Sequence, residues 1–290
     1  MYKKSRHLAR FAHIEPIAMP ALFRFISVVI FMSVIHPLTA QLANNPVIAH
    51  RGAWKKNALP ENSIASLQEA IRLGCYGSEF DVHLTKDDVI VVNHDPSFAG
   101  MDISTSSYAE LLTKKLSNGE SIPTAEAYLM AGMKQQRSKN LPGADQHQLT
   151  KLIYEIKSSA AGKDRTLELT RRSVELVHKL KAEKWVEYIS FDYDACLLVH
   201  KLDPAATVCY LAGDKSPEQL QTDGLSGLDY HFSVFENQTG WLADATTRKL
   251  VTNAWTVNEV AIMQKLLDQH IQLITTNEPE LLFSLLQEKK

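Results

Sequence analysis

Hydrophobic positions beyond about residue 45 alternate between two periods, one typical of strands and one typical of helices. The short apolar run from Val47 to His50 predicts a first strand. The segment from Ser63 to Leu73 follows, with Ile64, Leu67 and Ile71 on one face at helical spacing. This part of the chain therefore opens with a strand and an amphipathic helix.

The same alternation continues to the C-terminus. Further strands are predicted over residues 77–84, 89–94, 153–157, 186–191, 207–211, 228–232, 251–255 and 271–275. Further helices are predicted over residues 164–183, 195–202, 217–222, 241–249, 259–268 and 279–287. Repeated strand–helix units imply a parallel sheet. About eight such units predict an α/β fold, closed into a (β/α)8 TIM barrel.

The interval from Asp95 to Leu149 interrupts this rhythm because it is rich in Gly and Pro. One piece from Thr124 to Met133 has a helical pattern, and the polar stretch from Gln135 to Gln148 predicts a mobile loop. We expect part of this interval to form an insertion over the barrel mouth.

The first 40 residues have a different character. Several Lys and Arg residues precede an apolar run from Phe25 to Ile35, and small residues follow up to Ala40. This pattern is typical of a secretory signal, here residues 1–40 with cleavage after Ala40. The mature protein would then be secreted or periplasmic, with no stable membrane partner. Two alternatives remain open: translation from Met19, or an uncleaved membrane anchor, although the run is shorter than the ~20 residues of a span.

Composition adds few constraints. The 290 residues are 45% hydrophobic and carry a formal net charge of −2. One large domain fits the length that follows the leader. A nearly neutral chain without a basic stripe argues against nucleic-acid binding. Cys75, Cys196 and Cys209 are too widely spaced for a metal motif or a disulfide framework, so we expect them to be packing residues.

Two pairs of charged residues occupy alternate positions on predicted strands. Glu79 and Asp81 are two residues apart, so their side chains share one face while Phe80 points to the other. The same alternation applies to Glu155 and Lys157. The apolar face belongs against the helices, which places the charges inside the barrel, where unpaired charge is costly.

The three carboxylates Glu79, Asp81 and Glu155 offer only oxygen ligands. Hard cations such as Ca²⁺ or Mg²⁺ prefer such ligands, so the sequence predicts a site for one divalent cation. The alternative is a metal-free charge network in which Arg51 and Lys157 neutralise the carboxylates.

Other candidate residues lie at the ends of predicted strands. His50 and His94 end two of them, and two imidazoles beside a metal suit acid–base cleavage of a phosphodiester. Arg51 could bind phosphate through its planar fork, and Lys157 could stabilise charge on phosphate oxygens. Trp255 could wall the alcohol part of a substrate or, alternatively, pack in the core.

Four further polar residues lie on or near predicted strands. His83 shares the strand face of Glu79 and Asp81 but lies further along the chain, so it receives no chemical role. His231, Asp192 and Asp229 lie near predicted strand ends, and they are weak candidates that we expect to be rim residues.

Taken in order, several short motifs resemble those of the glycerophosphodiester phosphodiesterase family, over a span from about Pro46 to the C-terminus. They are His50-Arg51-Gly52, Pro60-Glu61-Asn62-Ser63, Glu79-Phe80-Asp81-Val82, His94-Asp95-Pro96, Ile122-Pro123-Thr124, Glu155-Ile156-Lys157 and Trp255-Thr256-Val257-Asn258. Two departures stand out: Ser63 replaces the commoner Thr, and Asn277 stands where the family usually has Asp.

The resemblance implies a TIM-barrel domain over residues 46–290 with a small insertion after the second strand, at about residues 96–122. It implies hydrolysis of a small glycerophosphodiester to sn-glycerol 3-phosphate and an alcohol. His50 and His94 would be the general acid and base in either order. The metal ligands would be Glu79, Asp81 and Glu155, with Arg51 and Lys157 on the phosphate.

Two other functions remain open. The same chemistry could act on a lysophospholipid or another phosphodiester, a choice that the short segment between Pro96 and Pro123 would influence. A non-catalytic binding protein on the same scaffold is the third possibility. The sequence does not specify the oligomeric state.

Overall fold

The computed structural model describes residues 45–137 and 149–288. The predicted secretory signal over residues 1–40 and residues 138–148 of the predicted loop lie outside these ranges. Within the two ranges, no helix combines the length and the apolar character that a membrane span needs.

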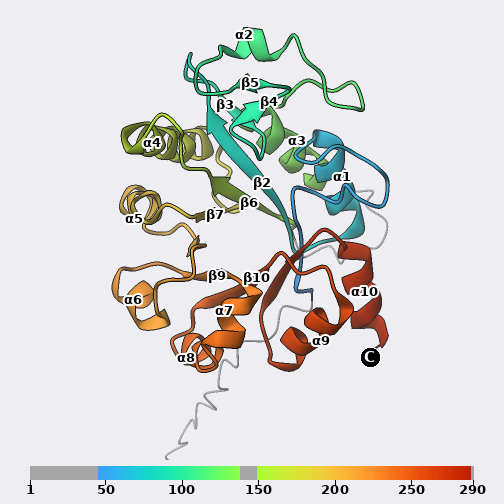
Figure 1. Cartoon of the computed structure of the whole chain (residues 1–290), viewed down its shortest axis with the longest axis vertical. Helices are drawn as coiled ribbons and strands as arrows, with labels where there is room; N and C mark the ends of the chain where they lie inside the picture. Colours follow the sequence, from blue (N-terminus) through green and yellow to red (C-terminus); the bar gives the residue numbers. More distant parts are fainter. Residues whose placement is uncertain (1–44, 138–148, 289–290) are drawn as a thin grey trace, which may run out of the picture. The chain divides into compact units, whose positions relative to one another are not determined.

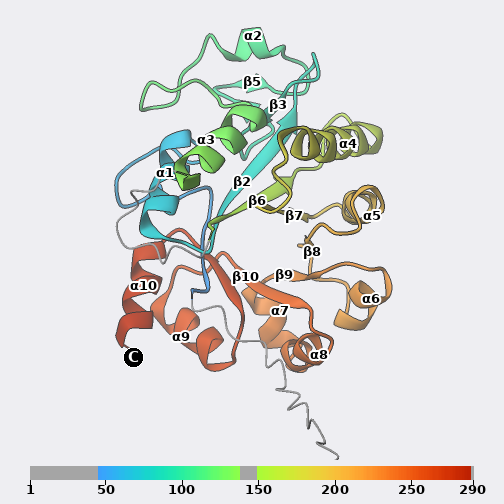
Figure 2. The same ribbon diagram turned by 180° about the vertical axis from the view of Figure 1, so that it is seen from behind.

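Eight parallel strands close into a barrel, with helices around its outside (Figures 1 and 2). Strand β1 pairs in parallel with both β2 and β11, which completes the ring. The barrel strands are β1 (Val47–Ala49), β2 (Gly77–Leu84), β6 (Lys151–Ile156), β7 (Val186–Ser190), β8 (Val208–Tyr210), β9 (Gly227–His231), β10 (Val251–Trp255) and β11 (Leu273–Thr276). The predicted (β/α)8 TIM barrel is confirmed.

Helices follow the barrel strands and cover their outer faces. They are α1 (Ile64–Leu73), α3 (Ala125–Arg137), α4 (Lys163–Leu180), α5 (Tyr193–Leu202), α6 (Pro217–Thr222), α7 (Phe232–Asn237), α8 (Trp241–Thr247), α9 (Val260–Asp268) and α10 (Pro279–Glu288). Helix α1 begins where the hydroxyl of Ser63 accepts a hydrogen bond from the Ser66 amide. It ends at Gly74, which takes the left-handed conformation at φ 75° that favours glycine.

Side chains alternate between the barrel interior and the helix layer, as the sequence pattern predicts. Phe80 packs outward against Tyr128 of α3 and Tyr154 of β6, with ring centroids 4.5 and 4.9 Å away. Its neighbours Glu79 and Asp81 are buried on the opposite face of β2, inside the barrel. Their inward direction therefore follows from where the aromatic side chain between them packs.

A small insertion follows β2. It contains β3 (Ile90–Val92), which pairs antiparallel with the end of β2, then β4 (Ser97–Phe98), β5 (Met101–Asp102) and α2 (Tyr108–Leu111). Phe98, Ile103, Leu111 and Ile122 join Val91 in a separate hydrophobic cluster. Figure 1 shows this insertion beyond the C-terminal end of β2. None of residues 95–124 lines the central pocket described below.

Several boundaries differ from the sequence-based predictions. Residues 135–137 belong to α3 and not to the predicted loop. Helix α4 ends at Leu180 and not at residue 183, because Lys181 turns the chain at a left-handed φ of 54°. Helix α7 was not predicted: it starts at Phe232, directly after β9, so an apolar residue that resembled the end of a strand begins a helix.

Candidate active site

A pocket of about 140 Å³ opens at the C-terminal ends of the barrel strands. Its walls come from inward-pointing residues of the strands and from the residues that follow the strands. The lining residues are His50, Arg51, Glu79, His94, Glu155, Lys157, Ile189, Phe191, Leu211, Asp229, Trp255, Thr256 and Thr275. The pocket is lined by the two predicted catalytic histidines and by the three predicted substrate-binding residues. Two of the three predicted metal ligands, Glu79 and Glu155, also line it.

A tight turn after β1 places His50 and Arg51. Arg51 adopts φ 56° and Gly52 adopts φ 82°, a left-handed region that disfavours side chains other than that of glycine. A Cβ atom on Gly52 would lie 2.4 Å from the Ser66 hydroxyl, so only glycine fits. The turn also aims the Arg51 amide at the carboxylate of Glu79, with an N–Oε2 distance of 2.8 Å. The strained backbone thereby connects the first strand to the acidic group.

Glu79, Asp81 and Glu155 form a buried acidic triad, with one oxygen atom from each within 4.8 Å of the others. Glu79 Oε1 is buried and has no hydrogen-bond partner among the described residues. An orphaned buried carboxylate oxygen in an all-oxygen donor set is what a hard divalent cation would satisfy. The triad therefore fits a divalent metal ion.

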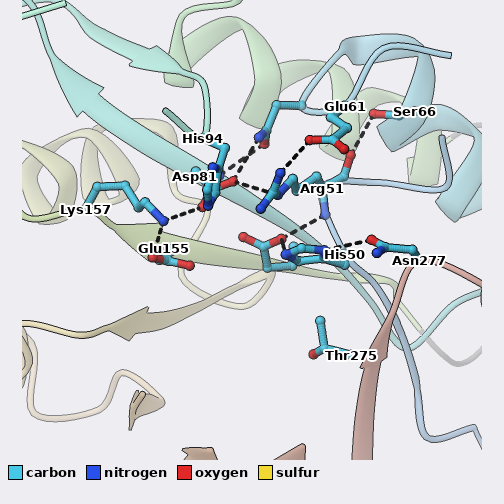
Figure 3. A network of polar contacts seen from close by, with 12 residues as sticks. His50, Arg51, Glu61, Ser66, Asp81, His94, Glu155, Lys157, Thr275 and Asn277 are labelled. Carbon is cyan, nitrogen blue, oxygen red and sulfur yellow. Dashed lines mark hydrogen bonds and ion pairs between the residues drawn. The ribbon is translucent and has the colours of Figure 1, made fainter. Parts of the chain in front are cut away.

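The metal-free alternative leaves this group poorly neutralised. Lys157 Nζ lies 2.8 Å from Glu155 and 3.2 Å from Asp81. Arg51 instead pairs with Glu61, with 2.6 Å between Arg51 Nη1 and Glu61 Oε2. Arg51 Nε lies 3.8 Å from Asp81 Oδ2. One close cation thus serves three buried carboxylates in the described part of the chain, and Figure 3 shows how these charges converge.

Asn62 orients the central carboxylate. Its Nδ2 donates to Asp81 Oδ2 at 2.8 Å, and its Oδ1 accepts from the Asp81 amide at 3.1 Å. Asn62 is buried and adopts φ 56°, a conformation that asparagine tolerates better than most residues. Asn62 belongs to the motif Pro60-Glu61-Asn62-Ser63, but nothing in the local sequence indicates its contact with Asp81, a residue 19 positions later.

The pKa values of the triad show the effect of this crowding. Burial, followed by the charges of Asp81 and Glu155, raises the pKa of Glu79 well above its usual range. Burial and the charge of Asp81 also raise the pKa of Glu155, to about 8. Asp81 is buried as well, but Lys157 and the amide of Asn62 lower its pKa below the ordinary value. Two of the three carboxylates thus need added positive charge to ionise.

His50 is held in place through both its main chain and its ring. Its amide donates to the carbonyl of Thr276 at 3.0 Å, and Nδ1 lies 2.7 Å from Asn277 Oδ1. Nε2 faces the acidic triad, 4.0 Å from Glu79 Oε2. Burial, followed by the charge of Arg51, lowers the pKa of His50 to about 4. The hydrogen bond to Asn277 opposes this shift, but its amide carries no charge.

His94 approaches the pocket from the chain that follows β3. Its Nδ1 lies 2.7 Å from Asp95 Oδ1, and its carbonyl lies 3.0 Å from His83 Nε2. His83, which received no role from the sequence, therefore supports the segment that carries His94. The two predicted catalytic histidines line one pocket but have different partners, an amide for His50 and an exposed carboxylate for His94.

Trp255 lies in the pocket wall at the end of β10. Its Nε1 donates to the main-chain carbonyl of Asp229 at 2.8 Å, and its ring packs edge-on to Phe191 at 5.4 Å. It also packs against the apolar cluster inside the barrel, so it lines the pocket and contributes to the core, and its contact with the alcohol part of a substrate stays a prediction.

Of the three polar residues expected at the rim, one lies elsewhere. Asp192 caps α5 and His231 caps α7, and both are half-buried. Asp229, by contrast, is 3% exposed and lines the pocket. The expectation of a rim position for Asp229 is wrong. The pattern Leu228-Asp229-Tyr230, an acid between two outward apolar residues, carries the same signal as Glu79-Phe80-Asp81 in inverted form.

The fold and the site define a TIM-barrel enzyme with an acidic triad, two histidines and two cations around one pocket. The model of the glycerophosphoryl diester phosphodiesterase family matches residues 50–281, and the chain belongs to this family of phosphodiesterases.

Relatives of known structure and sequence agree with this assignment. A glycerophosphodiester phosphodiesterase from Parabacteroides distasonis is 39% identical, with a TM-score of 0.78 over 85% of this chain and 98% of that one. A glycerophosphodiester phosphodiesterase from Caldanaerobacter subterraneus is 25% identical over 83% of this chain and 97% of its own length. An Oleispira antarctica phosphodiesterase, solved with the product sn-glycerol-3-phosphate, is 24% identical and shares the fold, with a TM-score of 0.68 over 83% of this chain and 96% of that one.

Proposed function

We propose that this enzyme hydrolyses glycerophosphodiesters to sn-glycerol 3-phosphate and an alcohol, with one divalent cation, Ca²⁺ or Mg²⁺, held by Glu79, Asp81 and Glu155. The observation that carries this proposal is the buried triad itself, two of whose members line one pocket together with His50, Arg51 and Lys157. Family membership and the product named for the Oleispira relative support it.

Phosphate binding falls to the two cationic side chains. Arg51 is held in place by Glu61, which leaves the rest of its guanidinium available to a phosphate oxygen. Lys157 is held between Asp81 and Glu155, and these carboxylates raise its pKa despite burial, so it stays charged. A cation bound by the triad would add positive charge beside the phosphate and polarise its P–O bonds.

The histidines divide the proton transfers. With Nδ1 donating to Asn277, the neutral His50 presents the Nε2 lone pair toward the triad, so His50 serves as the base. It would take a proton from water or from a neighbouring substrate hydroxyl. His94, whose Nδ1 pairs with Asp95, would protonate the departing alkoxide as the acid.

Pocket size bears on the alternative substrates. About 140 Å³ is small against the ~300–1,000 Å³ of typical sites for drug-sized ligands, which favours a short glycerophosphodiester over the long chain of a lysophospholipid. A purely binding role would require a missing acid, base or ligand, and the described pocket contains all of these residue types.

The test is release of glycerol 3-phosphate from glycerophosphocholine and glycerophosphoethanolamine by chelator-stripped protein, with and without added Ca²⁺ or Mg²⁺. We expect activity only after a cation is added. His50→Ala should fold and bind the cation but lose nearly all turnover, whereas His178→Ala, which removes an exposed His–Asp pair, should keep it. A folded protein with no release under any metal, or a fully active His50→Ala variant, would contradict the proposal.

A further inference from the structure

The two sides of the pocket differ in chemistry. Strands β1, β2 and β6 and the segments that follow them contribute its histidines, its two cations and Glu79 and Glu155. Strands β7 to β11 and the residues after them contribute mainly apolar and neutral groups, among them Ile189, Phe191 and Leu211. Within the lining residues of this second side, Asp229 is the one ionisable exception.

Asp229 is built into the barrel interior. Leu228 and Tyr230 on either side of it belong to the hydrophobic layer under the helices, so Asp229 points inward from β9. It is 3% exposed, and its Oδ1 has no hydrogen-bond partner in the described part of the chain. No ion pair of the described residues includes it. A buried carboxyl group with an unpartnered oxygen is costly unless something else satisfies it.

Neutral polar groups continue from Asp229 across the neighbouring strands. Asn253 stands beside it in register on β10, and its Nδ2 donates to Thr275 Oγ1 of β11 at 2.8 Å. Asn253 Oδ1 is also buried without a partner, and Thr275 lines the pocket like Asp229. We call these three residues, Asp229, Asn253 and Thr275, the polar arc. Unsatisfied acceptors on two adjacent strands suit a ligand that carries hydrogen-bond donors.

The polar arc favours a hydroxyl group over a cation as that donor. Burial raises the pKa of Asp229 to about 7, with Asn253 opposing the rise and Glu187 adding to it, so neutral and charged forms coexist at neutral pH. A hydroxyl group can donate to the charged form and accept from the neutral form. An ammonium group can donate to either form but cannot accept the O–H of the neutral form, and a quaternary ammonium group donates no N–H hydrogen bond at all.

We propose that Asp229 is a specificity-determining residue that binds a hydroxyl group of the substrate's glycerol moiety, with Asn253 and Thr275 positioning it. This inference rests on the proposed function, because it assigns the glycerol end of that substrate to the β9–β11 side of the pocket. A site that hydrogen-bonds a hydroxyl group rejects analogues that lack it, since its own buried polar group is then left unpaired.

The test compares Asp229→Leu with the parent enzyme and with Asp229→Asn. Leucine has a similar size and suits the apolar wall, so the variant should unfold at the same temperature as the parent or higher. Dissociation constants are measured by calorimetry, with metal present, for sn-glycerol 3-phosphate, inorganic phosphate and phosphoethanolamine. We expect Asp229→Leu to weaken sn-glycerol 3-phosphate binding at least tenfold and to leave the other two unchanged. Asp229→Asn, which keeps a hydrogen-bonding group, should recover most of the affinity.

Three outcomes would overturn the inference. Unchanged affinity for sn-glycerol 3-phosphate would show that Asp229 does not contact the glycerol. Selective loss of phosphoethanolamine would assign it to an amine. Equal loss for all three ligands would show that it supports the site as a whole. A parent enzyme that releases no glycerol 3-phosphate from any glycerophosphodiester would instead refute the proposed function, and this is seen before any variant is made.

Discussion

Asn62 offers the sharpest test of how the acidic triad is assembled. The residue makes two hydrogen bonds to Asp81, one to its carboxylate and one from its amide, at 2.8 and 3.1 Å. Replacing Asn62 with Gly removes both bonds and keeps the left-handed backbone of φ 56°, which glycine adopts freely. Replacing it with Ala removes the same bonds and adds backbone strain of about 1–2 kcal/mol.

The expected loss of metal affinity can be derived from the role of Asn62, which orients the metal ligand Asp81. Residues that orient a metal ligand typically contribute ~10–100-fold in metal affinity, which corresponds to about 1.4–2.7 kcal/mol. We therefore expect both Asn62→Gly and Asn62→Ala to bind Ca²⁺ or Mg²⁺ ~10–100-fold more weakly than the parent. Only the alanine variant should show the additional loss of stability from strain.

The assay is a metal titration by calorimetry, with thermal unfolding measured in parallel. Asn57→Ala is the matched control, because Asn57 makes one exposed hydrogen bond, to Glu69, which is not a member of the triad. Metal affinity of the glycine variant within twofold of the parent would refute the reasoning, since it would show that Asp81 keeps its orientation without Asn62. A loss confined to the alanine variant would indicate that backbone strain alone matters.

Three further predictions concern the turn, the triad and the leader. Gly52→Ala should lower the free energy of unfolding by at least about 2 kcal/mol, because the added Cβ would lie 2.7 Å from the Ser66 carbonyl carbon at a φ of 82°. Gly240→Ala is the control, because an added Cβ there would have no neighbour within 4 Å and should change the free energy of unfolding little. Thermal unfolding of the two variants measures the difference. In metal-free protein the pKa of Glu155 is raised from 4.5 to about 8, so the folded state binds more protons than the unfolded state and stability should fall as pH rises from about 4.5 through 8. Unfolding scans with chelator should show this decline, Ca²⁺ or Mg²⁺ should reverse it, and a pH-independent melting temperature in chelator would contradict it. Expression of the full chain in a secreting host should yield a protein whose N-terminal sequence starts at Gln41, whereas a membrane-bound product that retains residues 1–40 would support the anchor.

Much of the fold was predictable because strands and helices bury faces with different periods. The alternation of Glu79, Phe80 and Asp81 predicted the inward direction of both acids, since an aromatic side chain between two charges can only pack against the helices. Boundaries were less predictable. Phe232 is apolar and follows β9 directly, so nothing in the local pattern separates the end of the strand from the start of α7.

The site was predictable where each residue lies in a short motif and unpredictable where residues meet only through the closed barrel. Asn62 and Asp81 are 19 positions apart, and His50 and Asn277 are 227 apart. Asp229 had the strand alternation of an interior residue, but its proximity to a pocket opened by the first strands depends on β1 closing the ring with β11.

The two sides of the pocket differ in how closely their residues must fit together, which explains why the residues of the first strands were easier to predict than those of the later strands. Apart from Asp229, the charged lining groups come from β1, β2, β6 and the segments that follow them, because paired acids, bases and cations must share a small volume to neutralise one another. The segment after β8 carries no such constraint, because β8 is not a neighbour of β1, β2 or β6 in the barrel. Leu211 lines the pocket after β8, a strand that pairs with β7 and β9 and with no strand that carries a triad residue, so substitutions of Leu211 should alter KM for different alcohols while metal affinity stays unchanged. Under the proposed function, reaction chemistry and substrate choice would therefore lie on opposite sides of one pocket.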